Sequence, residues 1–223
     1  MRKTLLMPTV NEITGLKLMT PRLKPEWFDE VVVIDLHSTD GTIEFCKAQG
    51  WRVIDQKTPG ITNAYREALE HITGDAVVAF SPDGNSLPER IPDLLAKMEE
   101  GYDMVVVSRY VDGAKSEDDD FVTGLGNWMF TTIINVFFGG RYTDSLVMFR
   151  AFRKDIAVGL PTDLPRAGLE PFLSILCAKK GLKVCDIPGD EPKRVGSARK
   201  MSPILNGLDI LQLILRERFG RAS

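Results

Sequence analysis

Two runs of consecutive apolar residues constrain the fold of this chain more than any other feature. Val31–Ile34 and Met104–Val107 contain no polar residue and are rich in valine and isoleucine. A strand has this composition when both of its faces are buried, as in a parallel sheet covered by helices. With their neighbours these runs give the predicted strands Val31–Asp35 and Asp103–Ser108. Four more segments of strand length are Thr4–Met7, Trp51–Ile54, Ala76–Phe80 and Lys183–Ile187.

Helical segments separate these strands in the first half of the chain. They are Thr42–Gln49, Ile61–Ile72 and Pro88–Glu100, each beginning or ending at residues typical of helix caps. Strands that alternate with helices predict βαβ units with right-handed crossovers. The first half therefore reads as a doubly wound nucleotide-binding sheet.

The second half is less regular, and no linker divides it from the first. Lys115–Asp120 is predicted to be a solvated acidic loop, and Val158–Gly168 a loop with two prolines. Gly126–Phe138 predicts an apolar helix whose aromatic residues belong in the core, with a lipid-binding face as the alternative. Pro203–Phe219 predicts a helix whose leucine stripe packs against the domain or forms a dimer contact. A helix lying on a membrane surface is the alternative for this tail.

Charge and composition exclude several classes of protein. The formal charge of −3 gives no general attraction to nucleic acid. Three scattered cysteines are typical of reduced thiols in a cytosolic protein. No apolar stretch approaches the length of a membrane span, and the apolar run after Lys3 is too short for a signal peptide. We therefore expect a cytoplasmic protein, at most peripheral to a membrane.

Polar side chains follow four of the predicted strands. Glu12 comes after the first strand, Asp35 ends the second, Asp83 follows the fourth and Arg109 the fifth. Ligands of open α/β sheets bind at the carboxyl ends of the strands. The sequence therefore predicts one site to which all four residues contribute.

The segments around these residues resemble family 2 glycosyltransferases, in particular polyprenyl-phosphate glycosyltransferases such as dolichyl-phosphate mannose synthase. The resemblance covers roughly residues 3 to 201 in order. It rests on Pro8-Thr9-Val10-Asn11-Glu12, the turn from Val33 to Thr42, Ser81-Pro82-Asp83, Pro88-Glu89, Ser108-Arg109-Tyr110, Asp144 with Phe149-Arg150, and the run from Arg194 to Lys200.

The resemblance implies a single domain over residues 1–223 with the type A glycosyltransferase fold, also called the nucleotide-diphospho-sugar transferase fold. This fold is a mixed, mostly parallel sheet flanked by helices. Residues 1–110 are expected to form the nucleotide half and 111–202 the acceptor half, with 203–223 as a C-terminal helix.

The resemblance also assigns roles to residues of the site. Asp83 matches the metal-binding aspartate, so Mg²⁺ or Mn²⁺ is the expected cofactor, and a hard cation of this kind prefers carboxylate and phosphate oxygens. The other residues expected to bind the nucleotide sugar are Pro8, Thr9, Glu12, Asp35, His37, Ser81, Arg109, Arg194, Arg199 and Lys200.

Three departures from the family pattern stand beside these matches. Ser81 replaces the first aspartate of the metal motif, Leu36 and His37 replace an Asp-Gly pair, and Met148 replaces a glycine. Since Ser81 removes a negative ligand, a degenerate nucleotide-sugar-binding module without catalysis is one alternative function.

The leading function is metal-assisted, inverting transfer of a hexose from a nucleotide diphosphate sugar to a polyprenyl phosphate. Transfer to a soluble sugar or other small hydroxyl acceptor is the alternative, and it requires a general base. Asp144 is the first candidate for this base and Glu170 the second. The expected partners are the sugar donor and polyprenyl phosphate at a membrane surface, with a homodimer through the C-terminal helix left open.

Overall fold

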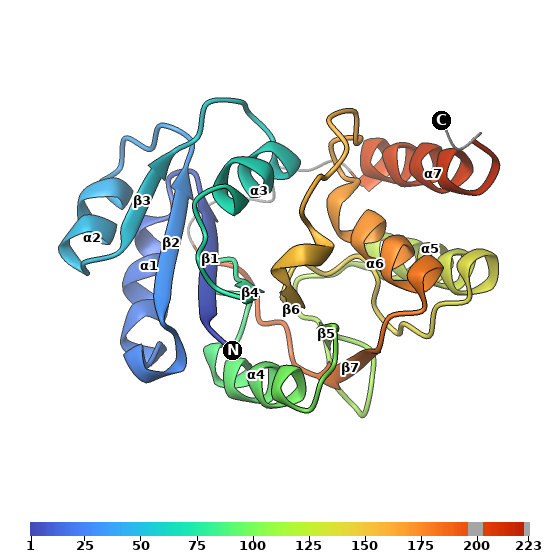
Figure 1. The fold of residues 1–223 in the computed structure, drawn as a ribbon, viewed down its shortest axis with the longest axis horizontal. Coiled ribbons are helices and arrows are strands. Elements are labelled where there is room, and N and C mark those ends of the chain that lie inside the picture. Colours follow the sequence, from blue (N-terminus) through green and yellow to red (C-terminus); the bar gives the residue numbers. More distant parts are fainter. Residues whose placement is uncertain (196–202, 221–223) are drawn as a thin grey trace.

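The computed structural model describes residues 1–195 and 203–220, and within them seven strands form one mixed sheet. Their order is β3-β2-β1-β4-β6-β5-β7 (Figure 1), and only β6 runs antiparallel to its neighbours. This confirms the predicted mostly parallel α/β sheet. The strands are β1 (Lys3–Thr9), β2 (Glu30–Asp35), β3 (Arg52–Asp55), β4 (Ala76–Ala79), β5 (Met104–Ser108), β6 (Arg150–Arg153) and β7 (Val184–Pro188).

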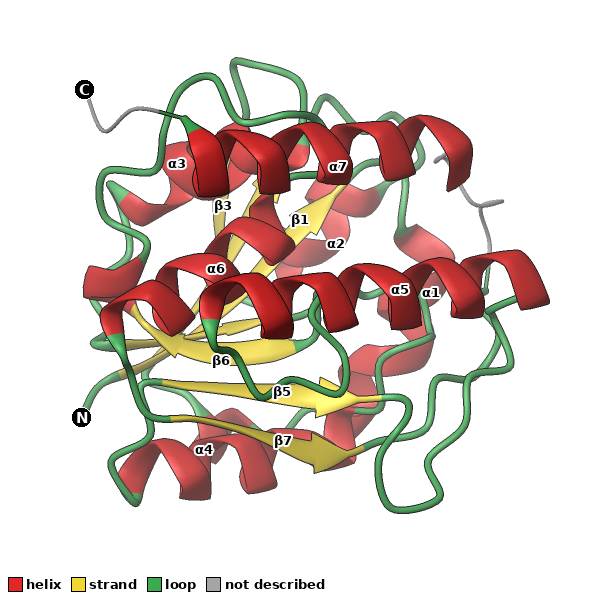
Figure 2. Cartoon of the chain, turned by 90° about the vertical axis from the view of Figure 1, so that its right-hand side faces the viewer, coloured by secondary structure: helices red, strands yellow, loops and turns green. Residues whose placement is uncertain are grey.

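Helices cover both faces of the sheet and give the molecule three layers (Figures 1 and 2). One layer holds α1 (Ile13–Met19), α2 (Thr42–Ala48) and α4 (Ile91–Glu99). The other holds α3 (Ile61–Leu69), α5 (Phe121–Phe138), α6 (Leu169–Lys180) and α7 (Pro203–Phe219). Short 3₁₀ turns lie at Thr20–Arg22, Pro25–Trp27, Pro88–Arg90 and Lys154–Ile156.

The apolar runs form strands because alternate residues fill two separate cores. In β5, Met104 and Val106 pack into the core beneath α3, α5, α6 and α7. Val105 and Val107 pack into the core beneath α1, α2 and α4. Both faces of this strand are therefore buried, which explains the continuous run of apolar residues.

Three elements were missed from the sequence, each for a local reason. Strand β6 has arginines at both ends, and its fully buried Arg150 donates to the carbonyls of Ser145 and Val147. Helix α6 carries Pro171 in its first turn and is apolar on most sides. Helix α1 contains Gly15, where a Cβ atom would stand 1.9 Å from the Pro82 carbonyl oxygen. In each case the buried surroundings outweigh the local pattern.

The two helices of the second half correct several expectations. Helix α5 begins at Phe121, five positions before the predicted start, because the Asp120 side chain accepts a hydrogen bond from the Thr123 amide. Phe130 is buried in the core and the half-buried Phe138 packs against it, whereas Trp128 and Phe137 are exposed. Helix α7 has the predicted bounds, but its leucine stripe faces outward and Ile210, Leu213 and Ile214 pack inward instead.

Candidate active site

The carboxyl ends of four parallel strands bring predicted site residues to one edge of the sheet. Thr9 ends β1, Asp35 ends β2, Asp83 follows β4 and Arg109 follows β5. All four are buried, with exposed fractions of 3%, 1%, 8% and 7%. Buried polar groups need partners, so the hydrogen bonds of these residues define the shape of the site.

Asp35 is held by uncharged donors. Its carboxylate accepts from the Thr9 hydroxyl at 2.6 Å, the Ser38 amide at 2.7 Å and the Ser38 hydroxyl at 2.6 Å. These bonds tie the turn after β2 to the end of β1, and Pro8 lies opposite Ile34 in the same pair of strands. Asp35 therefore shapes this part of the edge.

The loop after β1 is bound to the same turn. Asn11 has a positive φ of 56° and accepts from the Thr39 amide at 2.8 Å. The Glu12 amide donates to the Thr42 hydroxyl at 2.9 Å. His37, with φ of 52°, turns outward to Asp55, where its Nε2 lies 3.1 Å from a carboxylate oxygen. His37 thus stands at the outer rim of the predicted nucleotide site.

Asp83 lies in a tight turn after β4, beside the half-buried Ser81. One oxygen of its carboxylate is 3.6 Å from an Arg194 nitrogen. Its backbone carbonyl accepts from the Val195 amide at 2.6 Å. Residues after β7 therefore pack over the turn that the resemblance assigns to the metal.

Arg194 bridges this turn and the loop before α5. Its guanidinium donates to Asp118 at 2.9 Å in addition to its contact with Asp83. Both Asp118 and the neighbouring Asp119 are mostly buried, with side-chain exposures of 12% and 5%. The prediction of a solvated acidic loop at Lys115–Asp120 was therefore wrong for these two residues.

Arg109 is surrounded by three carboxylates. It binds Asp144 through two nitrogens, at 2.7 Å and 3.1 Å, and a third nitrogen lies 3.2 Å from both Asp119 and Glu191. Charge-assisted, two-pronged pairs of this kind are the strongest hydrogen bonds that side chains form. Within the described part of the chain, Arg109 and Arg194 are thus each paired with carboxylates of the protein itself.

The two candidate bases lie in different surroundings. Asp144 is fully buried and also accepts from Asn127 at 2.9 Å. Burial alone raises its pKa, but the Arg109 guanidinium and the Asn127 amide lower it, and the net shift is downward. Glu170 lies in the first turn of α6, where burial raises its pKa and the nearby Arg150 opposes that shift.

Glu191 is a site residue that sequence reasoning missed. It lies three residues after β7, and its carboxylate contacts Arg109 and accepts from the Ser116 hydroxyl. Burial raises its pKa, while Arg109 partly offsets the shift. Its position shortly after the last predicted strand, Lys183–Ile187, is the sequence signal that marks Glu191 as a strand-end residue. Arg199 and Lys200 lie outside the described residues.

The donor set at Asp83 fits a hard divalent cation. The described residues contain no cluster of three His, Cys, Asp or Glu side chains arranged for a metal. Mg²⁺, however, is often held by only one or two carboxylates together with phosphate oxygens of a substrate. The cationic group of Arg194 beside Asp83 indicates that this turn favours a positive charge.

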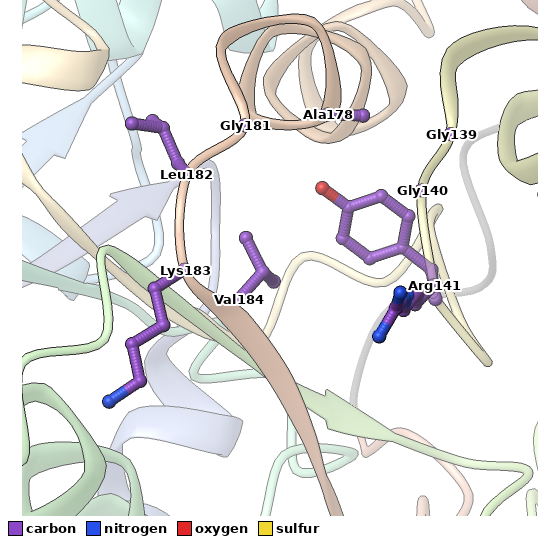
Figure 3. Close-up of a pocket in the computed structure, with 9 residues that line it drawn as sticks. Gly139, Gly140, Arg141, Ala178, Gly181, Leu182, Lys183 and Val184 are labelled. Carbon is purple, nitrogen blue, oxygen red and sulfur yellow. The ribbon is translucent and has the colours of Figure 1, made fainter.

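A hollow of about 350 Å³ lies elsewhere, at the amino end of β7 (Figure 3). It is lined by Tyr142, Leu182 and Val184, among others, and Arg141 and Lys183 lie on opposite sides of it. Since parallel strands carry their ligands at the carboxyl ends, this hollow is not the candidate active site.

Comparison with known proteins identifies the class of protein. The chain matches the model described as glycosyl transferase family 2 over residues 4–158. It is 30% identical to glycosyltransferase AglJ of Haloferax volcanii, over 98% of this chain and 71% of that protein. An uncharacterized protein of Methanocaldococcus jannaschii is 26% identical over 96% of this chain and 91% of its own length.

Solved structures of glucosyl-3-phosphoglycerate synthase from Mycobacterium tuberculosis share the fold. The complex with Mg²⁺ and uridine diphosphate has a TM-score of 0.77 at 19% identity, covering 100% of this chain and 81% of that one. The complex with Mn²⁺, UDP-glucose and phosphoglyceric acid has a TM-score of 0.75 at 21% identity, with coverage of 100% and 81%.

The fold and the family match together define a nucleotide-sugar-dependent glycosyltransferase with the type A fold. The chain belongs to glycosyl transferase family 2.

Proposed function

We propose that this enzyme transfers a hexose from a nucleotide diphosphate sugar to a polyprenyl phosphate, with inversion at the anomeric carbon. The observation that carries the proposal is the edge where Asp83, Arg109 and Arg194 meet the start of the apolar helix α5. A diphosphate donor and a lipid phosphate acceptor both need cations, and the acceptor also needs an apolar surface. This edge has both.

The donor-side roles follow from the chemistry of the residues. Asp83, with Ser81 beside it, would hold Mg²⁺ or Mn²⁺, which when bound neutralises charge on the leaving diphosphate. Arg109 and Arg194 add fixed positive charge, and Arg199 and Lys200 are proposed to join them. Glu12, Asp35 and the other donor-side residues, Pro8, Thr9 and His37, are proposed to contact the nucleoside.

Arg109 also gives Asp144 a role. Two hydrogen bonds hold the Arg109 guanidinium on the Asp144 carboxylate. The third guanidinium nitrogen can then bind Asp119, Glu191 or an incoming anion. We therefore assign Asp144 to positioning Arg109, in preference to the general-base role that the resemblance implies. A phosphate acceptor is already an anion, so transfer to it requires positioning more than deprotonation.

A lipid acceptor is supported by where α5 begins. Asp120 caps the helix, Asp119 contacts Arg109, and the next two residues, Phe121 and Val122, are exposed. The phosphate of a polyprenyl phosphate can therefore face Arg109 while its chain follows α5. We further propose that the enzyme works in the cytoplasm, peripheral to a membrane, with residues 1–110 on the donor side and 111–202 on the acceptor side.

Transfer to a small hydroxyl acceptor is the second candidate. The similar synthase solved with phosphoglyceric acid supports it, as does Glu191, whose raised pKa suits a general base. Glu170, also on the acceptor side, is a further carboxylate with a raised pKa.

The test begins with calorimetric titration of UDP, GDP, dTDP and CDP, each with and without Mn²⁺, which identifies the base. The matching nucleotide hexoses are then incubated with a polyprenyl phosphate or with phosphoglyceric acid. Label that moves into the lipid phase supports the proposal, whereas label only in the soluble product supports the second candidate. Failure of all four nucleotides to bind the folded protein would contradict the transferase proposal. Binding of a nucleotide without transfer to either acceptor would favour the degenerate nucleotide-sugar-binding module.

A further inference from the structure

The exposed apolar side chains of this protein gather on two helices. In the described residues all the exposed large apolar side chains lie on α5 and α7 except Met1, Leu18, Tyr110 and Val158. We name the rest the α5–α7 apolar face. It consists of Phe121, Val122, Leu125, Trp128, Met129, Val136 and Phe137 on α5, and Ile204, Leu205, Leu208, Leu211, Leu215 and Phe219 on α7.

The two helices form one continuous surface. Figure 2 shows them side by side and running in the same direction. The exposed rings of Phe137 and Phe219 meet edge to face with their centres 6.4 Å apart. Nearer the other end, a Cβ atom added to Gly207 would stand 3.6 Å from the Phe130 ring. A contiguous apolar surface of this extent marks an interaction site in a folded protein.

Helix α5 has the composition of a membrane segment and the packing of a surface helix. The expectation that no stretch approaches a membrane span was wrong for α5. Among the described residues it is the one helix long and apolar enough to cross a membrane, with a mean hydropathy of 1.3 and only 22% of its residues buried. It cannot leave the domain without cost, because Asn127 donates to the buried Asp144 and Phe130 and Ile134 lie in the core. This helix is therefore suited to lie on a bilayer instead of spanning one.

Charged residues at the two ends of the α5–α7 apolar face indicate the kind of surface that it binds. The carboxyl ends of α5, α6 and α7 converge, since Lys179 of α6 pairs with Glu217 of α7 and the hollow of Figure 3 joins α5 to α6. Exposed cations at this end are Arg141, Lys180 and Arg218. At the opposite end Asp118 and Asp119 already pair with arginines of the site. Glu117 and Asp120 are exposed at that end, whereas the exposed cations gather at the carboxyl ends, where they complement anionic lipid headgroups.

We propose that the α5–α7 apolar face docks this protein on the surface of an anionic lipid bilayer. Trp128, Phe121 and their neighbours enter the headgroup region, and the cations at the carboxyl ends contact lipid phosphates. The amino ends of both helices lie toward the active-site edge, so docking would bring that edge close to the bilayer. The purpose of the docking rests on the proposed lipid acceptor, but the docking itself does not.

Vesicle sedimentation tests this inference. Full-length protein is mixed with phosphatidylcholine vesicles with and without phosphatidylglycerol, at low and high salt. We expect it to sediment with both, more with the anionic vesicles, and to keep part of its binding at high salt because apolar insertion is not screened. The variant Leu125→Ser/Trp128→Ser/Leu208→Ser should lose at least about tenfold in vesicle partitioning.

The matched control is Leu18→Ser/Val158→Ser, which removes exposed apolar side chains elsewhere and should bind vesicles as the wild type does. Binding of the identified nucleotide should be unchanged in both variants, which separates failure of docking from failure of the donor site. Equal loss in the control, or no sedimentation of the wild type, would overturn the inference. So would a dimer in solution that the face variant alone dissociates, because the face would then bind a second copy.

Discussion

The two sides of the active-site edge stabilise their buried carboxylates in different ways. On the donor side, Asp35 is satisfied by hydroxyl and amide donors of the adjoining turn. On the acceptor side, Asp144 and Asp118 are satisfied by Arg109 and Arg194. Uncharged local bonds fix a shape, whereas an arginine shared among several acids can exchange one anion for another. We therefore propose that the surroundings of Asp35 act as a rigid template, and that Arg109 and Arg194 act as cations that the donor diphosphate and an acceptor phosphate can share.

The largest effect on stability is expected at Arg109. Arg109→Met leaves the buried Asp144 without its cation, and breaking such a pair costs about 3–5 kcal/mol of unfolding free energy. Arg22→Met is the control, since its exposed pair with Glu89 should contribute at most about 1 kcal/mol. Urea unfolding measures both, and similar losses in the two variants would contradict the role of Arg109.

A smaller loss is expected on the donor side. Asp35→Asn keeps one acceptor oxygen but presents an NH₂ group to donors from Thr9 or Ser38. Because a donor then faces a donor, we expect the free energy of unfolding to fall by about 1–3 kcal/mol. The same urea experiment measures this loss. A larger loss at Asp35 than at Arg109 would reverse the comparison between the two sides.

Removing a competitor of the diphosphate should tighten nucleotide binding. Asp118→Asn weakens the hold on Arg194, so we expect the dissociation constant of the donor diphosphate to fall about threefold to tenfold. The control is Asp112→Asn, an exposed residue with φ of 50° that asparagine also adopts. Calorimetry measures both constants. Weaker binding in Asp118→Asn would mean that the pair with Arg194 is needed to build the site.

The smallest expected effect is a change in the free energy of unfolding with pH. The pKa of Glu191 is raised in the folded protein, so its contribution to stability is fully present below its ordinary pKa of 4.5 and is lost as pH rises through the raised value. The stability that Asp144 contributes has the opposite pH dependence. Because its pKa is lowered in the folded protein, this contribution is lost as pH falls.

The wild-type advantage over Glu191→Gln should therefore shrink as pH rises from about 4 to 7. Unfolding free energies measured across this interval provide the comparison. A difference that stays constant with pH would show that Glu191 does not titrate as proposed.

Much of the fold could be predicted because buried parallel strands have a distinctive composition. Six strands were found from their apolar runs, and Pro203–Phe219 from its helical period. Strand β6 could not be found in this way, because its charged Arg150 is buried with hydrogen bonds to the Ser145 and Glu170 carbonyls, which lie outside the strand. The outward direction of the α7 leucines was also hidden, since a helical stripe does not reveal whether its partner belongs to the same domain.

The candidate site was predictable where it follows the ends of strands. Asp35, Asp83 and Arg109 meet at the expected edge for that reason. The partners of the arginines were not predictable, because Asp119 and Glu191 come from loops whose positions depend on the folded chain. The resemblance made Asp144 a candidate base, and only the structure reveals its two hydrogen bonds to Arg109.

The most direct test of the account is calorimetric binding of the donor diphosphate to wild type, Asp83→Asn and the control Asp93→Asn, each with and without Mn²⁺. The account predicts that Mn²⁺ strengthens binding to the wild type and to the control, and that Asp83→Asn loses this enhancement, with about a hundredfold or greater loss of transfer activity. Equal enhancement in Asp83→Asn would contradict the claim that Asp83 holds the metal with the donor.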